Sequence, residues 1–222
     1  MKVCVAGCSV SDRYEIKDCY GDVVSRLLEA EYLHLAASSG SNDRTWRLVT
    51  DQIVKGAITP QDLLIVQYTE VTRTEFWYEQ DLKITASEPS CDQGCVIKFK
   101  INNFKRSATE QASKEISRFY QMYQQHFLNK NFEQEKFRLR HSQFQCMLLH
   151  YDIATVFVDS SRIGPGDYEI KMTGRLSRFR DNSNKILENN LSRHDSCHFS
   201  QEGARLLADQ LVEHVRGLSW LA

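Results

Sequence analysis

The stretch VCVAGCSVSDRY, residues 3–14, guides the interpretation of the rest of the chain. Its run of small and apolar residues ends at Gly7-Cys8-Ser9, which is typical of a buried strand that breaks into a tight turn. The turn would present the Ser9 hydroxyl at the carboxyl end of the first strand, where open α/β sheets bind their ligands. A plain strand-to-helix turn is the structural alternative. Ser9 is therefore the first candidate for chemistry, and any partner residues must come from elsewhere in the chain.

Composition limits the class of protein. A chain of 222 residues with 41% hydrophobic content fits one domain over residues 1–222. Its 28 basic side chains balance 29 acidic ones, so we expect no nucleic-acid partner. Because we find neither a signal-peptide pattern nor an apolar run of membrane-spanning length, we expect no membrane partner. The seven cysteines lie mostly in apolar or helical contexts, as reduced thiols do, which predicts a cytoplasmic protein. The sequence leaves the oligomeric state open.

The first 70 residues alternate between strand and helix patterns. A strand is expected at residues 32–36, a helix through residues 46–54, and a fully buried strand at residues 63–67, where the apolar run is continuous. The helix after the first strand is expected to contain Val23, Val24, Leu27, Leu28 and Tyr32. Three strands separated by helices predict an α/β fold: a three-layer α/β/α sandwich around a doubly wound, mainly parallel sheet.

The middle of the chain departs from this alternation. Residues 76–106 read as an insertion, a lid or hairpin near the site, with a half-exposed strand at residues 96–101. Cys91 and Cys95 lack the spacing of a zinc knuckle and have no second pair, so we expect a structural role and no metal. Residues 107–150 read as helical. The first helix carries an aromatic stripe, and the second covers residues 133–149, with Lys136, Arg138 and Arg140 on a solvated face. The stripe consists of Ala112, Ile116, Phe119, Tyr120, Tyr123 and Phe127.

The last third holds the second group of candidate residues. A buried strand is expected at residues 153–158, followed by an extended loop over residues 160–193. Ser200 is a suitable N-cap for a terminal helix whose inward stripe is Leu206, Leu207, Leu211 and Val215. Asp195 and His198 precede that helix. A carboxylate three residues before a histidine can accept from its Nδ1–H and leave Nε2 free to face a nucleophile. A solvent-exposed turn without chemistry is the alternative.

In chain order, these elements together resemble the SGNH (GDSL-type) hydrolase family, of which this chain would be a divergent member. Gly7-Cys8-Ser9-Val10 matches the family's Gly-Asp-Ser-Leu block, and Asp195-x-x-His198 matches its Asp-x-x-His block. The resemblance implies an SGNH/flavodoxin-like fold and a triad of Ser9 as nucleophile, His198 as base and Asp195 as the carboxylate that orients it. It implies no metal and no organic cofactor.

The same resemblance places an oxyanion hole at the ends of the first three strands. It implies backbone N–H donors at Ser9 and Gly40, and a side-chain donor at Thr69. The family has asparagine at the position of Thr69, and a threonine hydroxyl donates only one bond from a shorter side chain. Asn42 could supply the amide instead. Cys8 also departs from the family, since it replaces an aspartate that is not the attacking group.

The activity implied by the resemblance is that of a serine esterase, which forms a covalent acyl intermediate on Ser9. A small-molecule or glycan ester would be the substrate, with an O-acetyl group on carbohydrate as one option from the family's range. Acyl transfer to a second alcohol, such as a glycan, by the same triad stays open, as does a catalytically degenerate SGNH-like binding domain. A cysteine phosphatase loop is disfavoured because Cys8 and Arg13 are separated by four residues instead of five. A dinucleotide site is disfavoured because GCSVSD lacks the glycine-rich pattern.

Overall fold

The structure of the chain is a computed structural model. It describes residues 1–8, 11, 12, 16–37, 40–71, 74–78, 82–86, 118, 122, 125, 126, 129–159, 174–180 and 198–220. Ser9 and Asp195 lie outside the described residues. So do Cys91, Cys95, the expected strand at residues 96–101, and the six residues of the aromatic stripe.

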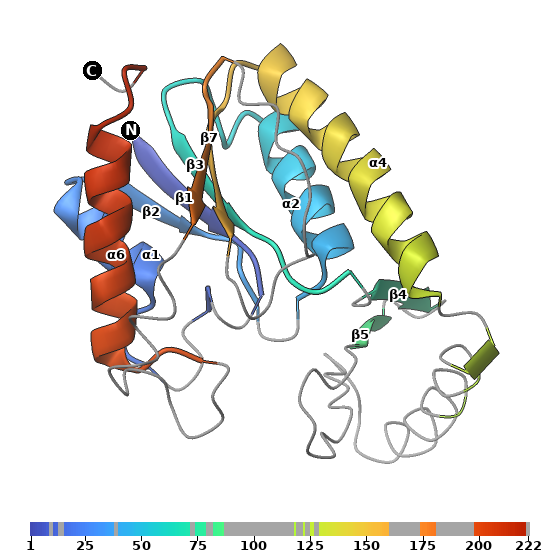
Figure 1. Cartoon of the computed structure of the whole chain (residues 1–222). Helices are drawn as coiled ribbons and strands as arrows, with labels where there is room; N and C mark the ends of the chain where they lie inside the picture. Colours follow the sequence, from blue (N-terminus) through green and yellow to red (C-terminus); the bar gives the residue numbers. More distant parts are fainter. Residues whose placement is uncertain are drawn as a thin grey trace.

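A five-stranded parallel sheet forms the centre of the fold (Figure 1). Its strand order is β2-β1-β3-β6-β7, with β1 at Lys2–Ala6, β2 at Glu31–His34, β3 at Leu63–Gln67, β6 at Ala154–Asp159 and β7 at Leu176–Arg180. This is the flavodoxin-like order, in which the chain winds first to one side of β1 and then to the other. Ligands of such sheets bind at the carboxyl ends of β1 and β3, where the winding reverses.

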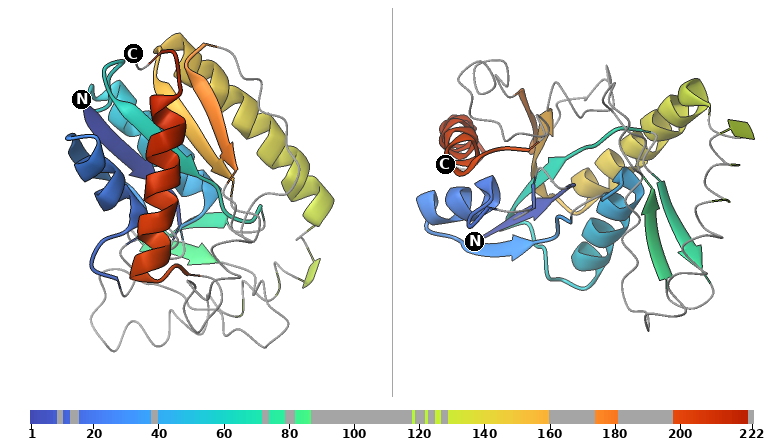
Figure 2. Two further views of the ribbon diagram at one scale, coloured as in Figure 1. Left: turned by 60° about the vertical axis from the view of Figure 1, so that its left-hand side comes forward. Right: turned by 90° about the horizontal axis from the view of Figure 1, so that it is seen from below.

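Helices cover both faces of the sheet (Figure 2). Helices α1 (Tyr20–Leu27) and α6 (Gln201–Arg216) cover one face, while α2 (Asn42–Val54) and α4 (Lys130–His150) cover the other. Val3 and Val5 of β1 pack with the α1/α6 cluster, and Cys4 and Ala6 pack with the α2/α4 cluster. Because each central strand is buried on both sides, its sequence is a continuous apolar run. The predicted three-layer α/β/α fold is confirmed.

Several predicted elements differ from the structure in their bounds. Tyr32 lies in β2, because α1 ends at Leu27 and Glu29 takes a positive φ of 51° that breaks the helix. The expected helix at residues 133–149 is α4, which begins three residues earlier, at Lys130. Ser200 is the N-cap of α6 as predicted, since its side chain accepts from the Gly203 N–H at 3.1 Å.

Part of the expected loop at residues 160–193 is wrong, because β7 lies within it. β7 has the sequence LSRFR, and its polar residues have partners inside the fold. Ser177 bonds His214 and Arg178 pairs with Asp159, on opposite sides of this edge strand. These partners are distant in sequence, so the pattern alone hid the strand. An antiparallel pair, β4 (Thr74–Tyr78) and β5 (Leu82–Ala86), lies where the insertion was expected to begin. None of the described helices combines the length and the apolar character that crossing a membrane requires.

Candidate active site

The turn after β1 is fixed on both sides of Ser9. The Ser11 N–H donates to the Cys8 carbonyl at 3.0 Å, so one hydrogen bond joins the residues that flank Ser9 and Val10. Cys8 and Ser11 are both buried. The Ser11 hydroxyl lies 2.8 Å from the hydroxyl of Tyr20 and donates to Oε1 of Gln67, the last residue of β3. The turn that carries the proposed nucleophile is therefore bonded to the neighbouring strand and to α1.

Gly40, the predicted backbone donor of the oxyanion hole, lies against the backbone of Gly7 and Cys8. A Cβ at position 40 would come within 2.8 Å of the Gly7 carbonyl oxygen and 3.0 Å of that of Ala37. Only glycine therefore lets the two backbones approach this closely. The N–H of Gly40 donates to the Ala37 carbonyl at 2.9 Å. That donor is already engaged in a turn, so it would have to be shared to serve an oxyanion.

Thr69 and Asn42 meet at the carboxyl end of β3. The Asn42 carboxamide accepts from the Thr69 N–H through Oδ1 and donates to the Thr69 carbonyl through Nδ2, both at 2.9 Å. Both residues are buried. The Thr69 hydroxyl is also buried and has no hydrogen-bond partner among the described residues. The structure thus brings the two candidate side-chain donors into contact, with Asn42 holding the backbone that carries Thr69.

The residue before Thr69 fixes the same strand end through α2 and α4, which cover one face of the sheet. The Tyr68 hydroxyl accepts from Trp46 Nε1 at 3.2 Å and lies 2.8 Å from Nδ1 of His141, a buried residue of α4. Burial, with a smaller effect of the Arg178 charge, lowers the pKa of His141 to about 4. His141 is therefore neutral near pH 7, and its Nδ1 shares one hydrogen bond with the Tyr68 hydroxyl. Tyr68 consequently anchors the segment that presents Thr69.

His198 lies two residues before the N-cap of α6. The amino-terminal end of α6 lies at the same end of the sheet as the carboxyl ends of β1 and β3 (Figure 1). Gln201, in the first turn of α6, bonds the backbone of Asp18 twice: Nε2 donates to the carbonyl at 2.9 Å, and Oε1 accepts from the N–H at 3.2 Å. These bonds tie the segment that carries His198 to the loop between the Ser9 turn and α1.

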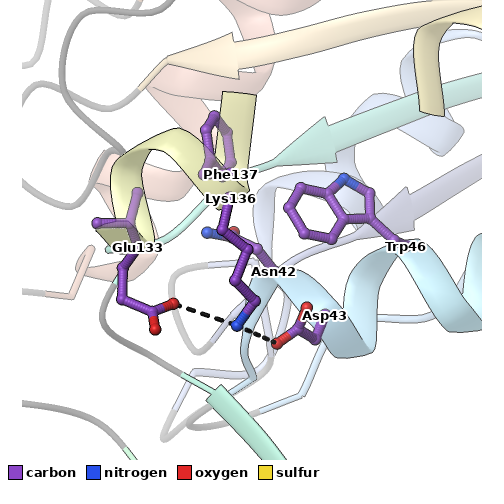
Figure 3. Close-up of a pocket in the computed structure, with 7 residues that line it drawn as sticks. Asn42, Asp43, Trp46, Glu133, Lys136 and Phe137 are labelled. Carbon is purple, nitrogen blue, oxygen red and sulfur yellow. Dashed lines mark hydrogen bonds and ion pairs between the residues drawn. The ribbon is translucent and has the colours of Figure 1, made fainter. Parts of the chain in front are cut away.

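A small cavity lies beside Asn42, between α2 and α4 (Figure 3). Seven residues line it: Asn42, Asp43, Trp46, Val71, Glu133, Lys136 and Phe137. The Lys136 ammonium lies 3.2 Å from the Glu133 carboxylate and 4.0 Å from that of Asp43. Arg140 also pairs with Asp43. Lys136 and Arg140 thus tie α4 to the first turn of α2 from a face that stays open to solvent, with 29% and 48% of their side-chain surfaces exposed.

Sequence reasoning assigned no role to Ser11 or Gln67. Gln67 is the one polar residue of β3, and it lies at the strand end nearest the Ser9 turn. A glutamine that closes an otherwise apolar strand is the signal that could have identified it. Among the described residues, no cluster of three or more histidine, cysteine or acidic side chains could hold a metal ion.

Comparisons with known proteins find likeness in structure and not in sequence. No family model matches the chain, and no curated protein matches it either. One similar structure is the psychrotrophic esterase EstA of Pseudoalteromonas sp., with a TM-score of 0.51 and 7% identity over 97% of this chain and 96% of that one. Another is a G-D-S-L family lipolytic protein of Veillonella parvula, with a TM-score of 0.52 and 8% identity over 98% and 100%. The chain therefore has the three-layer fold of G-D-S-L lipolytic proteins.

Proposed function

We propose that the chain is a serine hydrolase that cleaves an acyl ester, with Ser9 as nucleophile, His198 as base and Asp195 as the carboxylate that orients it. The observation that carries the proposal is the position of the carboxyl ends of β1, β2 and β3. These neighbouring strands end at the point where the strand order of the sheet reverses. Gly7 and Cys8, which lead into Ser9, approach Gly40 there, and the carboxamide of Asn42, two residues after Gly40, binds the backbone of Thr69. Two structures of similar fold belong to an esterase and to a lipolytic protein.

The proposed reaction has two acyl-transfer steps. His198 Nε2 takes the Ser9 proton as the Ser9 oxygen attacks the ester carbonyl, and the alcohol then leaves with that proton. Water repeats the sequence on the acyl-enzyme, and the acid is released. The oxyanion would be met by the Ser9 backbone N–H and by the Thr69 hydroxyl, which is buried and has no partner among the described residues. The second N–H of the Asn42 amide and a shared Gly40 N–H are the further candidates.

The ester is proposed to be a small acyl group, such as acetyl, on a small molecule or a glycan. If a second alcohol replaced water in the second step, the same residues would carry out acyl transfer. The engaged N–H of Gly40 favours one alternative, a binding domain that keeps the fold without the chemistry. The oxyanion hole would then lack the Gly40 N–H, a donor that an esterase of this kind needs.

Labelling with a fluorophosphonate separates an esterase from a binding domain. Trypsin releases residues 3–13 as one peptide, and fragment ions distinguish labelled Ser9 from Ser11. We expect label on Ser9 in the native protein, none in Ser9→Ala, and a rate reduced at least about a thousandfold in His198→Ala. Turnover of p-nitrophenyl acetate should be lost in the same variants. An unlabelled, folded native protein would overturn the proposal.

A further inference from the structure

Two strands that flank β1 hold the residues just after the Ser9 turn. From β3, Gln67 accepts from the buried Ser11 hydroxyl. From β2, His34 Nε2 lies 3.0 Å from Asp12 Oδ1, and both side chains are about three-quarters buried, with 26% and 22% of their surfaces exposed. Since β2 and β3 lie on opposite sides of β1, Ser11 and Asp12 are held from both directions.

Both ring nitrogens of His34 are engaged. Nδ1 lies 2.8 Å from the Tyr32 hydroxyl, which lies 3.2 Å from the Cys19 sulfur, and the Cys19 thiol donates to Asp22 Oδ2 at 3.2 Å. A charged imidazolium fits this series of hydrogen bonds, because Asp12 and Tyr32 can each accept a hydrogen bond from one of its two N–H groups. His34 is therefore unsuited to act as the general base, the role proposed for His198.

The surroundings of His34 favour its charged form. The hydrogen bond to Asp12 is the largest of the effects that raise the pKa of His34 to about 9, and the bond network through Cys19 adds to it, against burial. Among the described residues, the ionisable groups around the ring are Asp12 in the turn, Tyr32 on the same strand, and Cys19 with Asp22 at the start of α1. From α2, Arg44 donates to the carbonyl of Leu35, the residue after His34, at 2.9 Å.

We propose that His34 is a positioning residue, which holds the Ser9 turn in its reactive place through its ion pair with Asp12. The inference rests on the proposed function, in which Ser9 is the nucleophile. When His34 loses its proton, Asp12 loses a charged partner, and Tyr32 turns its hydroxyl hydrogen toward Nδ1. The neutral Nε2–H can still donate to Asp12, but this hydrogen bond is no longer between two charged groups, so the turn is held less firmly. Reactivity of Ser9 should therefore decline in alkaline solution by a route independent of His198.

The test is the rate of Ser9 labelling by a fluorophosphonate between pH 6 and pH 10, corrected for hydrolysis of the probe. In the native protein we expect the rate to fall as the pH rises through about 9. His34→Gln should label about ten- to a hundredfold more slowly at pH 7.5 and lack this alkaline fall, because a small misplacement of a reacting group is costly. His34→Arg, which keeps a cation beside Asp12, should recover part of the rate and hold it to pH 10.

A second variant and a control complete the experiment. Asp12→Asn keeps a hydrogen-bonding side chain of the same shape, so it should fold, label slowly and lower the pKa of the His34 imidazole, which NMR can follow. Asp51→Asn, which alters an exposed pair with Lys55, should label like the native protein. If Ser9 is labelled but His34→Gln and Asp12→Asn keep the native profile, the positioning role is wrong while the hydrolase proposal stands. If Ser9 is not labelled at any pH, both fail.

Discussion

Replacing Asn42 with alanine tests whether the Asn42 carboxamide holds Thr69, a candidate residue of the oxyanion hole, in place. The carboxamide makes two bonds of 2.9 Å to the backbone of Thr69, and both residues are almost fully buried. Alanine leaves a buried N–H and a buried C=O unpaired, at about 1–3 kcal/mol each. The free energy of unfolding should therefore fall by about 2–6 kcal/mol, a large share of the roughly 5–15 kcal/mol typical of a domain.

Urea denaturation followed by circular dichroism measures this change, with the midpoint and slope fitted separately. Val54→Ala serves as the matched control, because Val54 lies on the same helix but is 69% exposed, and its change should stay within about 0.5 kcal/mol. Asn42→Ala should also slow labelling of Ser9, since Thr69 loses its backbone anchor. A loss of less than about 1 kcal/mol would refute the view that Asn42 holds Thr69 in place.

Three further predictions concern the same region. Thr69→Val should lower esterase turnover by about a hundredfold or more, while Thr69→Asn should match or exceed the native rate; equal rates in both variants would remove Thr69 from the oxyanion hole. Gly7→Ala should destabilise the protein by about 1–3 kcal/mol, because its Cβ would meet Ser11 Oγ at 2.7 Å and the Gln67 carbonyl oxygen at 3.0 Å. Gly217→Ala, with no contact under 3.4 Å, is its control, and equal midpoints would contradict the steric argument. Because the pKa of His141 is about 4 when folded and about 6.5 when unfolded, the unfolded chain binds the extra proton, and stability should fall as the pH drops between these values. In His141→Phe, the free energy of unfolding, measured by urea denaturation, should depend less on pH between pH 4 and pH 6.5. The same pH dependence in the variant and the native protein would contradict this prediction.

The central strands could be predicted because their signal is local. Leu63–Gln67 is a continuous apolar run, and the structure gives β3 the same bounds. β7 could not be predicted, because its polar side chains are satisfied by Asp159 and His214, which are distant in sequence. The hydrophobic pattern of an edge strand thus depends on partners that the chain order does not reveal.

The candidate site divides in a similar way. Gly40 and His198 could be proposed from chain order, because a resemblance to a family fixes which strand end each one follows. The roles of Gln67 and His34 could not, because each depends on which strands lie beside β1. That arrangement follows from the pairing of residues about 30 and 60 positions apart. The engaged N–H of Gly40 was also invisible to sequence, since it depends on the backbone of the turn that begins at Ala37.

The position of α6 has a consequence for how the protein is synthesised. Leu207, Leu211 and Val215 of this last helix pack in one cluster with Val3 and Val5 of the first strand. While the ribosome is still translating the intervening residues, the apolar side of β1 has no α6 to cover it. Exposed apolar surface of this kind makes nascent chains prone to aggregation. Completion of this half of the core must therefore wait until residue 215 has left the ribosome, and chaperones that shield apolar segments should improve the yield of folded protein.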